Sequence, residues 1–154
     1  MDLLTLSIGI GLIVGLIFVS SLGLSTGGMI VPGYLALQMG DPLSVAVTIV
    51  DALIIYAIVK LLSKYMIIYG RRRIALMILL AFISGILMNH MLVDFAVHGL
   101  LGDAIQVIGY IIPGLIALSM DRQGIIETVG SLLIATVFVR LVLIILMGSV
   151  VIAL

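Results

Sequence analysis

The chain has very little charge and no cysteine. Of its 154 residues only 9% are charged, seven basic and seven acidic, whereas 64% are hydrophobic. A soluble domain of this size must cover its surface with polar groups, and about a quarter of its residues are charged. The absence of cysteine excludes disulfides, thiolate metal sites and cysteine nucleophiles. The composition therefore predicts an integral membrane protein with no soluble catalytic domain, no metal, no cofactor and, at zero net charge, no nucleic-acid partner.

Charge is entirely missing from residues 3–40, between Asp2 and Asp41. As one helix this stretch would be about 57 Å long at ~1.5 Å per residue, nearly twice the ~30 Å hydrocarbon core of a bilayer. The stretch must therefore break or double back.

Hydrophobic runs bounded by charges or by glycine and proline predict an all-α membrane protein with five to six membrane segments. Five of the seven basic residues lie at the end of the third segment and in the turn after it, and the positive-inside rule places that turn in the cytoplasm. We expect a single membrane domain over 1–154, with a half over 1–68, a basic turn over 69–73 and a half over 74–154. The predicted segments are 3–22, 28–39, 43–62, 74–93, 103–120 and 126 to the C-terminal end.

A Pro-Gly segment occurs twice. Residues 28–39 align with residues 109–120 with seven identities in twelve positions, which predicts two pseudo-symmetric halves. Proline breaks the helical hydrogen bond to the residue four positions back and is favoured at a helix start, so new half-helices should begin at Pro32 and Pro113. The unpaired amides of Gly33 and Gly114 would then face an anion, as in transporters with broken helices. The alternative is an ordinary proline kink satisfied by neighbouring helices.

Two charges lie well inside predicted segments, Asp51 and Arg140. Each costs about 2.5–3.5 kcal/mol near a helix centre, so both should face the protein interior and pair with each other. Their depths match if the Pro-Gly segments cross the membrane, which gives inverted halves. They differ if these segments re-enter, which gives parallel halves, and both arrangements stay open.

The remaining polar and small-residue patterns are weaker. Rows of small residues predict close helix packing, either within the chain or between copies. His90 and His98, with Asp94 between them, are typical of a solvated rim rather than a metal site. The arginines of the basic turn could set the orientation of the chain in the membrane, dock a cytoplasmic partner, or do both. The small-residue rows are Ser7, Gly11 and Gly15, and Ala81, Gly85 and Asn89; the arginines are Arg71, Arg72 and Arg73.

Four motifs resemble, in order and spacing, the small membrane subunit of bacterial poly-γ-glutamate synthase, the CapC/PgsC family. The resemblance spans almost the whole chain, although residues 20–27 lack the charged pair that the family commonly has before its first Pro-Gly segment. The motifs are Val31-Pro32-Gly33-Tyr34-Leu35, Tyr69-Gly70-Arg71-Arg72-Arg73, Ile112-Pro113-Gly114-Leu115-Ile116-Ala117 and Gln123-Gly124.

The resemblance implies a subunit that is not catalytic alone. It implies a complex with a cytoplasmic ATP-dependent amide ligase and a membrane-anchored third subunit, in which this chain supports synthesis and export of the polyanion. The predicted polymer path contains Pro32, Gly33, Tyr34, Pro113, Gly114 and Arg140. The alternatives are a small standalone anion transporter or channel and a scaffold without a path, and homo-oligomerisation stays open.

Overall fold

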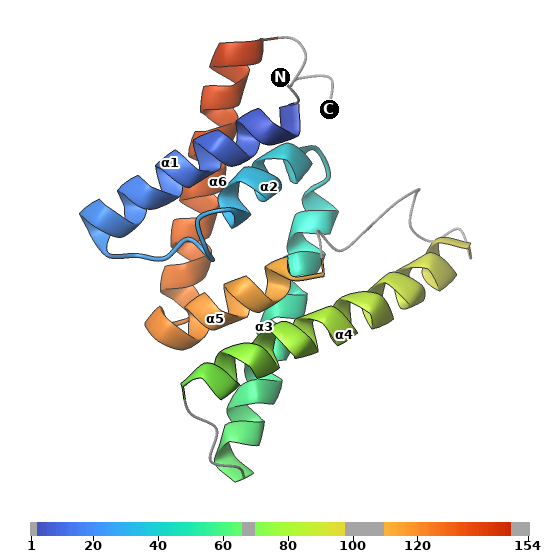
Figure 1. Cartoon of the computed structure of the whole chain (residues 1–154). Coiled ribbons are helices and arrows are strands. Elements are labelled where there is room, and N and C mark those ends of the chain that lie inside the picture. The colour runs from blue at the N-terminus through green and yellow to red at the C-terminus, as the bar shows by residue number, and fades with distance from the viewer. Residues whose placement is uncertain (1–2, 66–69, 98–109, 149–154) are drawn as a thin grey trace. The chain divides into compact units, whose positions relative to one another are not determined.

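Every regular element in the described part of the chain is helical, as the sequence predicts. The computed structural model describes residues 3–65, 70–97 and 110–148 (Figure 1). The elements are α1 (Leu3–Leu22), α2 (Val31–Leu37), the short 3-10 helix η1 (Gln38–Gly40), α3 (Pro42–Tyr65), α4 (Arg71–Val97), α5 (Ile112–Gln123) and α6 (Ile125–Met147).

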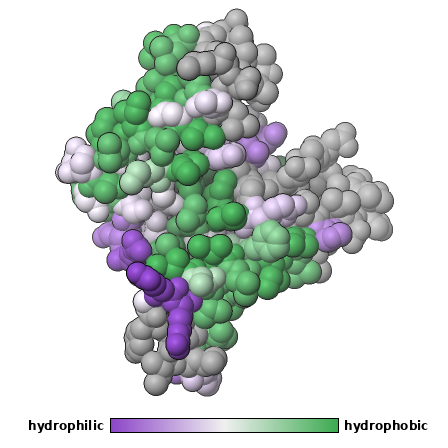
Figure 2. Space-filling view, viewed as in Figure 1, coloured by the Kyte–Doolittle hydropathy of each residue, from purple (hydrophilic) through white to green (hydrophobic). Residues whose placement is uncertain are grey.

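Among the described residues, three helices are long and apolar enough to cross a membrane. These spans are Thr5–Leu22 in α1, Pro42–Tyr65 in α3 and Ile125–Leu146 in α6. Large apolar side chains point outward from them, such as Leu16 at 56% and Ile145 at 79% exposed. Hydrophobic residues also cover much of the face drawn in Figure 2. Such a surface suits lipid rather than water, which supports the predicted association with a membrane.

The uncharged stretch breaks where glycines adopt a left-handed backbone. α1 ends at Leu22, as predicted, and α2 begins at Val31. Gly23, Gly27 and Gly28 between them have φ values of 67°, 78° and 110°. Only glycine adopts such angles without steric cost, so the chain leaves one helix and enters the next here. The two helices begin at Val31 and Ile112, one residue before the predicted starts, so Pro32 and Pro113 each occupy the second helical position.

Several predicted boundaries differ from the structure, and the starts of α4 and α5 matter most. Arg71, Arg72 and Arg73 form the first turn of α4 and do not belong to the turn before it. The chain turns at Gly70, whose φ is 64°, and arginine is a good helix former, so the helix starts immediately afterwards. The fifth segment, predicted from residue 103, is a helix from Ile112 onward, and its first part lies outside the described residues.

The helices form two compact units that do not follow the order of the chain. The first unit contains residues 1–42 and 119–154, and the second contains residues 43–118. In the first unit α1, α2 and α6 pack against one another (Figure 1). The second unit contains α3, α4 and most of α5. Each unit therefore takes one long helix from the opposite half of the sequence.

Each unit has its own small apolar core. In the first, Val14 of α1 and Ala36 of α2 pack against Ala135, Val139 and Leu143 of α6. In the second, Ile55 and Val59 of α3 pack against Met77 and Ala81 of α4 and Ala117 of α5. Both cores include alanines, which let the helix backbones approach closely.

Candidate functional site

The first Pro-Gly helix, α2, lies directly against α1. A Cβ added to Gly33 would lie 2.7 Å from the carbonyl oxygen of Ser7, and one added to Gly11 would lie 2.7 Å from the Gly33 nitrogen. The Ser7 hydroxyl also donates to the Gly33 carbonyl at 2.7 Å. Gly33 thus provides a close helix crossing, and its backbone nitrogen faces α1.

The second Pro-Gly helix, α5, makes the same kind of contact with α4. A Cβ on Gly114 would lie 2.8 Å from the Ala81 Cβ and 3.1 Å from the Met77 carbonyl oxygen. One on Gly85 would lie 2.8 Å from the ring of Tyr110, just as one on Gly15 would lie 3.1 Å from Met29. The predicted small-residue rows therefore pack within the chain. The Asn89 side chain lies outside what the structure describes.

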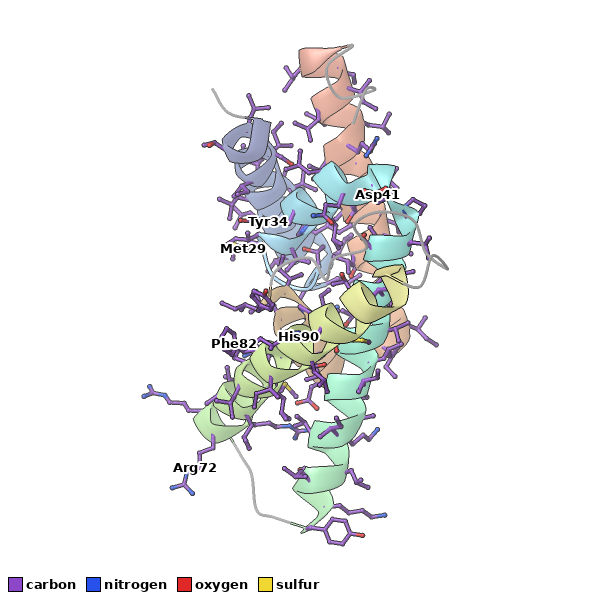
Figure 3. All side chains as sticks on the ribbon, turned by 90° about the vertical axis from the view of Figure 1, so that its right-hand side faces the viewer. Met29, Tyr34, Asp41, Arg72, Phe82 and His90 are labelled. Atoms are coloured by element: carbon purple, nitrogen blue, oxygen red, sulfur yellow. The ribbon has the colours of Figure 1, made fainter. Side chains whose placement is uncertain are left out.

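Arg140 reaches from α6 to the C-terminal end of α2. Its Nη1 donates to the carbonyl oxygen of Ala36 at 3.2 Å, and the residue is half-buried. The last carbonyls of a helix have no partner within the helix and form the negative end of its dipole, so a guanidinium stabilises them. Tyr34, near the middle of the same helix, is also half-buried, and its amide donates to the Ile30 carbonyl at 3.3 Å (Figure 3).

Asp51 is fully buried on α3. Its Oδ1 accepts a hydrogen bond from the hydroxyl of Ser84 on α4, whereas Oδ2 has no hydrogen-bond partner among the described residues. Asp51 and Arg140 each have a partner inside their own unit, and their pairing with each other stays a prediction.

The basic residues cluster at the start of α4. Arg71 and Arg72 are exposed, and Arg72 extends away from the helix (Figure 3). The first turn of α4 contains no acidic residue, so its positive dipole adds to the three guanidinium charges. This end of the helix is strongly attractive to anionic groups, and its use as a docking site stays a prediction. Of the histidine pair, His90 is exposed on α4 and His98 lies outside the described residues.

A network of uncharged polar groups in the first unit was not predicted from the sequence. The Gln123 side chain accepts from the Ser25 amide at 2.7 Å and donates to the Ser25 carbonyl at 2.6 Å. The Ser25 hydroxyl bonds to that of Ser119 at 3.0 Å, and Ser131 donates to the Ser25 carbonyl at 3.2 Å. These bonds fix the segment between α1 and α2 to the C-terminal end of α5 and the start of α6. Clustered Ser, Thr and Gln residues in an apolar sequence are the signal that would have revealed it.

The described part of the chain is thus an α-helical protein with three helices apolar and long enough to cross a membrane and two further helices that carry a Pro-Gly pair in their first turn. Comparison with known proteins then gives the family. The family model described as "Capsule biosynthesis CapC" matches residues 10–129, so the chain belongs to this family and the predicted resemblance is confirmed.

Two curated relatives match most of the chain. The "PGA biosynthesis protein CapC" of Bacillus subtilis (strain 168) is 37% identical over 128 residues, covering 81% of this chain and 83% of that protein. The "Capsule biosynthesis protein CapC" of Bacillus anthracis is 33% identical over 131 residues, covering 83% of this chain and 85% of that protein. No solved structure matches significantly.

Proposed function

We propose that this chain is the membrane subunit of a complex that synthesises and exports poly-γ-glutamate. The observation that carries this proposal is the family match over 10–129, which includes both Pro-Gly helices and the basic start of α4. The relatives are named for biosynthesis of capsule or of PGA, and the chain covers more than four-fifths of each.

The activating chemistry would come from a partner. Ligation of glutamate requires an activated carboxylate, and we assign that step to a cytoplasmic ATP-dependent amide ligase, with a membrane-anchored third subunit in the same complex. The exposed guanidiniums of Arg71 and Arg72 support a docking role. They lie at the positive end of the α4 dipole, where a basic residue does not stabilise the helix, so their charge is available to an acidic surface of a partner. The positive-inside rule places this end of α4 on the cytoplasmic side of the cell membrane.

The two units are proposed to be pseudo-symmetric, within a fold of five to six membrane segments. In α2 and α5, aligned on Pro32 and Pro113, the order of buried and half-buried positions agrees for the first seven residues. The glycine contacts of α1 with α2 also correspond to those of α4 with α5, with Gly11 and Gly15 matching Ala81 and Gly85. The third helix of each unit, α6 or α3, then comes from the opposite half of the sequence.

The polymer path is proposed to follow the two Pro-Gly helices and Arg140. A guanidinium has five N–H donors, and the hydrogen bond to Ala36 uses one of them, so Arg140 can also bind a carboxylate. Gly33 and Gly114 contribute by holding α2 and α5 against their neighbours. Pro32 and Pro113 lie buried at the starts of these helices, and Tyr34 lies half-buried on α2.

Purification of this chain in detergent, followed by identification of the co-purifying proteins by mass spectrometry, tests the assignment. An ATP-dependent ligase bound to this chain supports the complex, and a chain that purifies alone while transporting a small anion supports the standalone transporter.

The path needs a separate test. Pro32→Ala combined with Pro113→Ala should shorten or abolish secreted polymer while the ligase still co-purifies, whereas Pro42→Ala should leave secretion unchanged. Pro42 is the matched control because it is the remaining proline of the chain and is exposed. Full-length secreted polymer from the double variant would favour a scaffold without a path.

A further inference from the structure

The buried face of α3 is polar at its N-terminal end. Its buried residues are Ser44, Thr48, Asp51, Ala52, Ile55 and Val59. Thr48 satisfies its hydroxyl within the helix by donating to the Ser44 carbonyl at 2.8 Å. Asp51 is different, because its carboxyl group turns away from its own helix toward Ser84 of α4.

The carboxyl group of Asp51 is only half satisfied. A carboxylate has two oxygens with about four acceptor positions, and the described structure gives Oδ2 none of the donors it requires. Asp51 has no exposed surface, so water does not compensate. A buried acceptor without a partner is costly, and a buried charge without a counter-charge is far more costly.

The corresponding place in the first unit does not need a carboxyl group. Aligning α3 with α6 so that Thr48 matches Thr128 and Val59 matches Val139 brings Asp51 onto Ser131. Both positions are buried, yet Ser131 is satisfied by the carbonyls of Ser25 and Thr128 at 3.2 and 3.1 Å. Since a neutral hydroxyl serves the packing there, the carboxyl group of Asp51 must meet a different requirement. This step rests on the pseudo-symmetry proposed above.

We propose that Asp51, supported by Ser84, is an intramembrane binding site for a small monovalent cation, either a proton or an alkali-metal ion. The cation neutralises the carboxyl group at Oδ2, where the protein supplies no donor. Ser84 is a positioning residue that fixes the carboxyl group through Oδ1. Ionisable groups buried in membrane segments commonly bind or relay ions, because their burial is otherwise unfavourable.

Other titratable groups of the packed elements lie elsewhere. On α3, Lys60 is exposed and donates to the Tyr56 hydroxyl at 3.2 Å. On α4, Arg71, Arg72 and Arg73 are at the N-terminal end, and His90 is exposed beyond Ser84. Tyr110, before the start of α5, packs edge-on against Phe82 of α4, and Asp121 and Arg122 of α5 belong to the first unit. A fixed counter-ion for Asp51 is therefore absent among the groups described in its own unit.

The experiment uses dicyclohexylcarbodiimide, an apolar reagent that modifies protonated carboxyl groups buried in membranes. The purified full chain in detergent is treated with it, and modified peptides are identified by mass spectrometry. Asp51 should be modified, whereas the exposed Asp41 and Glu127 serve as controls within the same molecule. Asp51→Asn should remove the modification, and Ser84→Ala should change its rate without removing it.

Sodium and pH distinguish the two cations. Loss of modification on adding sodium chloride at constant pH, but not choline chloride, identifies an alkali-metal site. Loss as the pH rises, without an effect of sodium, identifies a proton site.

Two results would overturn the proposal. The first is an Asp51 that stays unmodified at every pH. The second is an Asp51 that becomes reactive only in Arg140→Gln, because Arg140 would then be its counter-ion. Neither readout involves the polymer, so failure here leaves the proposed function intact.

Discussion

Replacement of Gly11 by alanine should separate α1 from α2 and destabilise the first unit. The new Cβ would lie 2.7 Å from both the Cα and the nitrogen of Gly33, whereas carbon atoms in contact sit about 3.5 Å apart or more. The two backbones would have to move apart by roughly 0.8 Å, since no flexible side chain can yield. That movement would also stretch the 2.7 Å hydrogen bond from Ser7 to Gly33.

The expected cost follows from these two losses. Overpacking of this kind costs about 1–3 kcal/mol, and a hydrogen bond within a membrane contributes about 0.6 kcal/mol. Alanine also has a higher helix propensity than glycine by about 1 kcal/mol, which offsets part of the cost. The matched control is Gly9→Ala in the same helix, because nothing lies within 4 Å of its new Cβ and the propensity gain is the same.

The comparison of the two variants isolates the packing term. We expect Gly11→Ala to be less stable than Gly9→Ala by about 2–3 kcal/mol, or roughly 4–12 °C at ~2–4 °C per kcal/mol. The midpoint temperature for loss of the monodisperse peak in detergent, measured by size-exclusion chromatography, provides the readout. Equal midpoints for the two variants would refute the close contact between α1 and α2.

Further variants test the polar contacts. Gln123→Ala should leave the Ser25 amide without its side-chain partner and the Ser25 carbonyl with only the Ser131 hydroxyl, at a cost of about 1–3 kcal/mol. The segment between α1 and α2 should then be proteolysed faster, and an unchanged rate would contradict the network. Arg140→Gln should lower secreted polymer while the protein still folds, because glutamine keeps a polar amide at this half-buried position but has no charge for a carboxylate. Normal polymer from Arg140→Gln, at normal protein levels, would remove Arg140 from the path.

Much of the helix pattern could be predicted from the sequence, because membrane helices are recognised by the length and hydrophobicity of their sequences. The end of α1 and the starts of α2 and α5 follow from glycine and proline chemistry. The small-residue rows were informative for a similar reason, since only small residues permit the approach of Gly11 to Gly33.

The partners of each helix could not be predicted in the same way. The hydrophobic residues of α6 do not gather on one side of the helix, so hydrophobicity alone does not distinguish the face toward lipid from the face toward α1 and α2. A helix in lipid has no hydrophobic stripe to bury, and its packing depends on small local fits such as Ala135 against Ala36. The hydrogen bonds of Gln123 were missed because they join residues 98 positions apart in sequence.

Each unit contains one long helix from the opposite half of the sequence, so the two halves of the chain should be stable only when both are present. The first unit requires α6 from the second half of the sequence, and the second unit requires α3 from the first half. Residues 1–68 and 69–154, expressed as separate chains, should each be degraded alone but accumulate and co-purify when expressed together.

The core of the first unit supplies the control for this experiment. Ala135 is fully buried against Ala36, so Ala135→Leu in the second fragment should abolish its rescue of the first, by overpacking that costs about 1–3 kcal/mol. Its neighbour Ile134 is 61% exposed, and Ile134→Leu should leave the rescue intact. Stable accumulation of residues 1–68 alone would mean that α1 and α2 do not need α6. That result would contradict a first core in which α6 supplies Ala135, Val139 and Leu143.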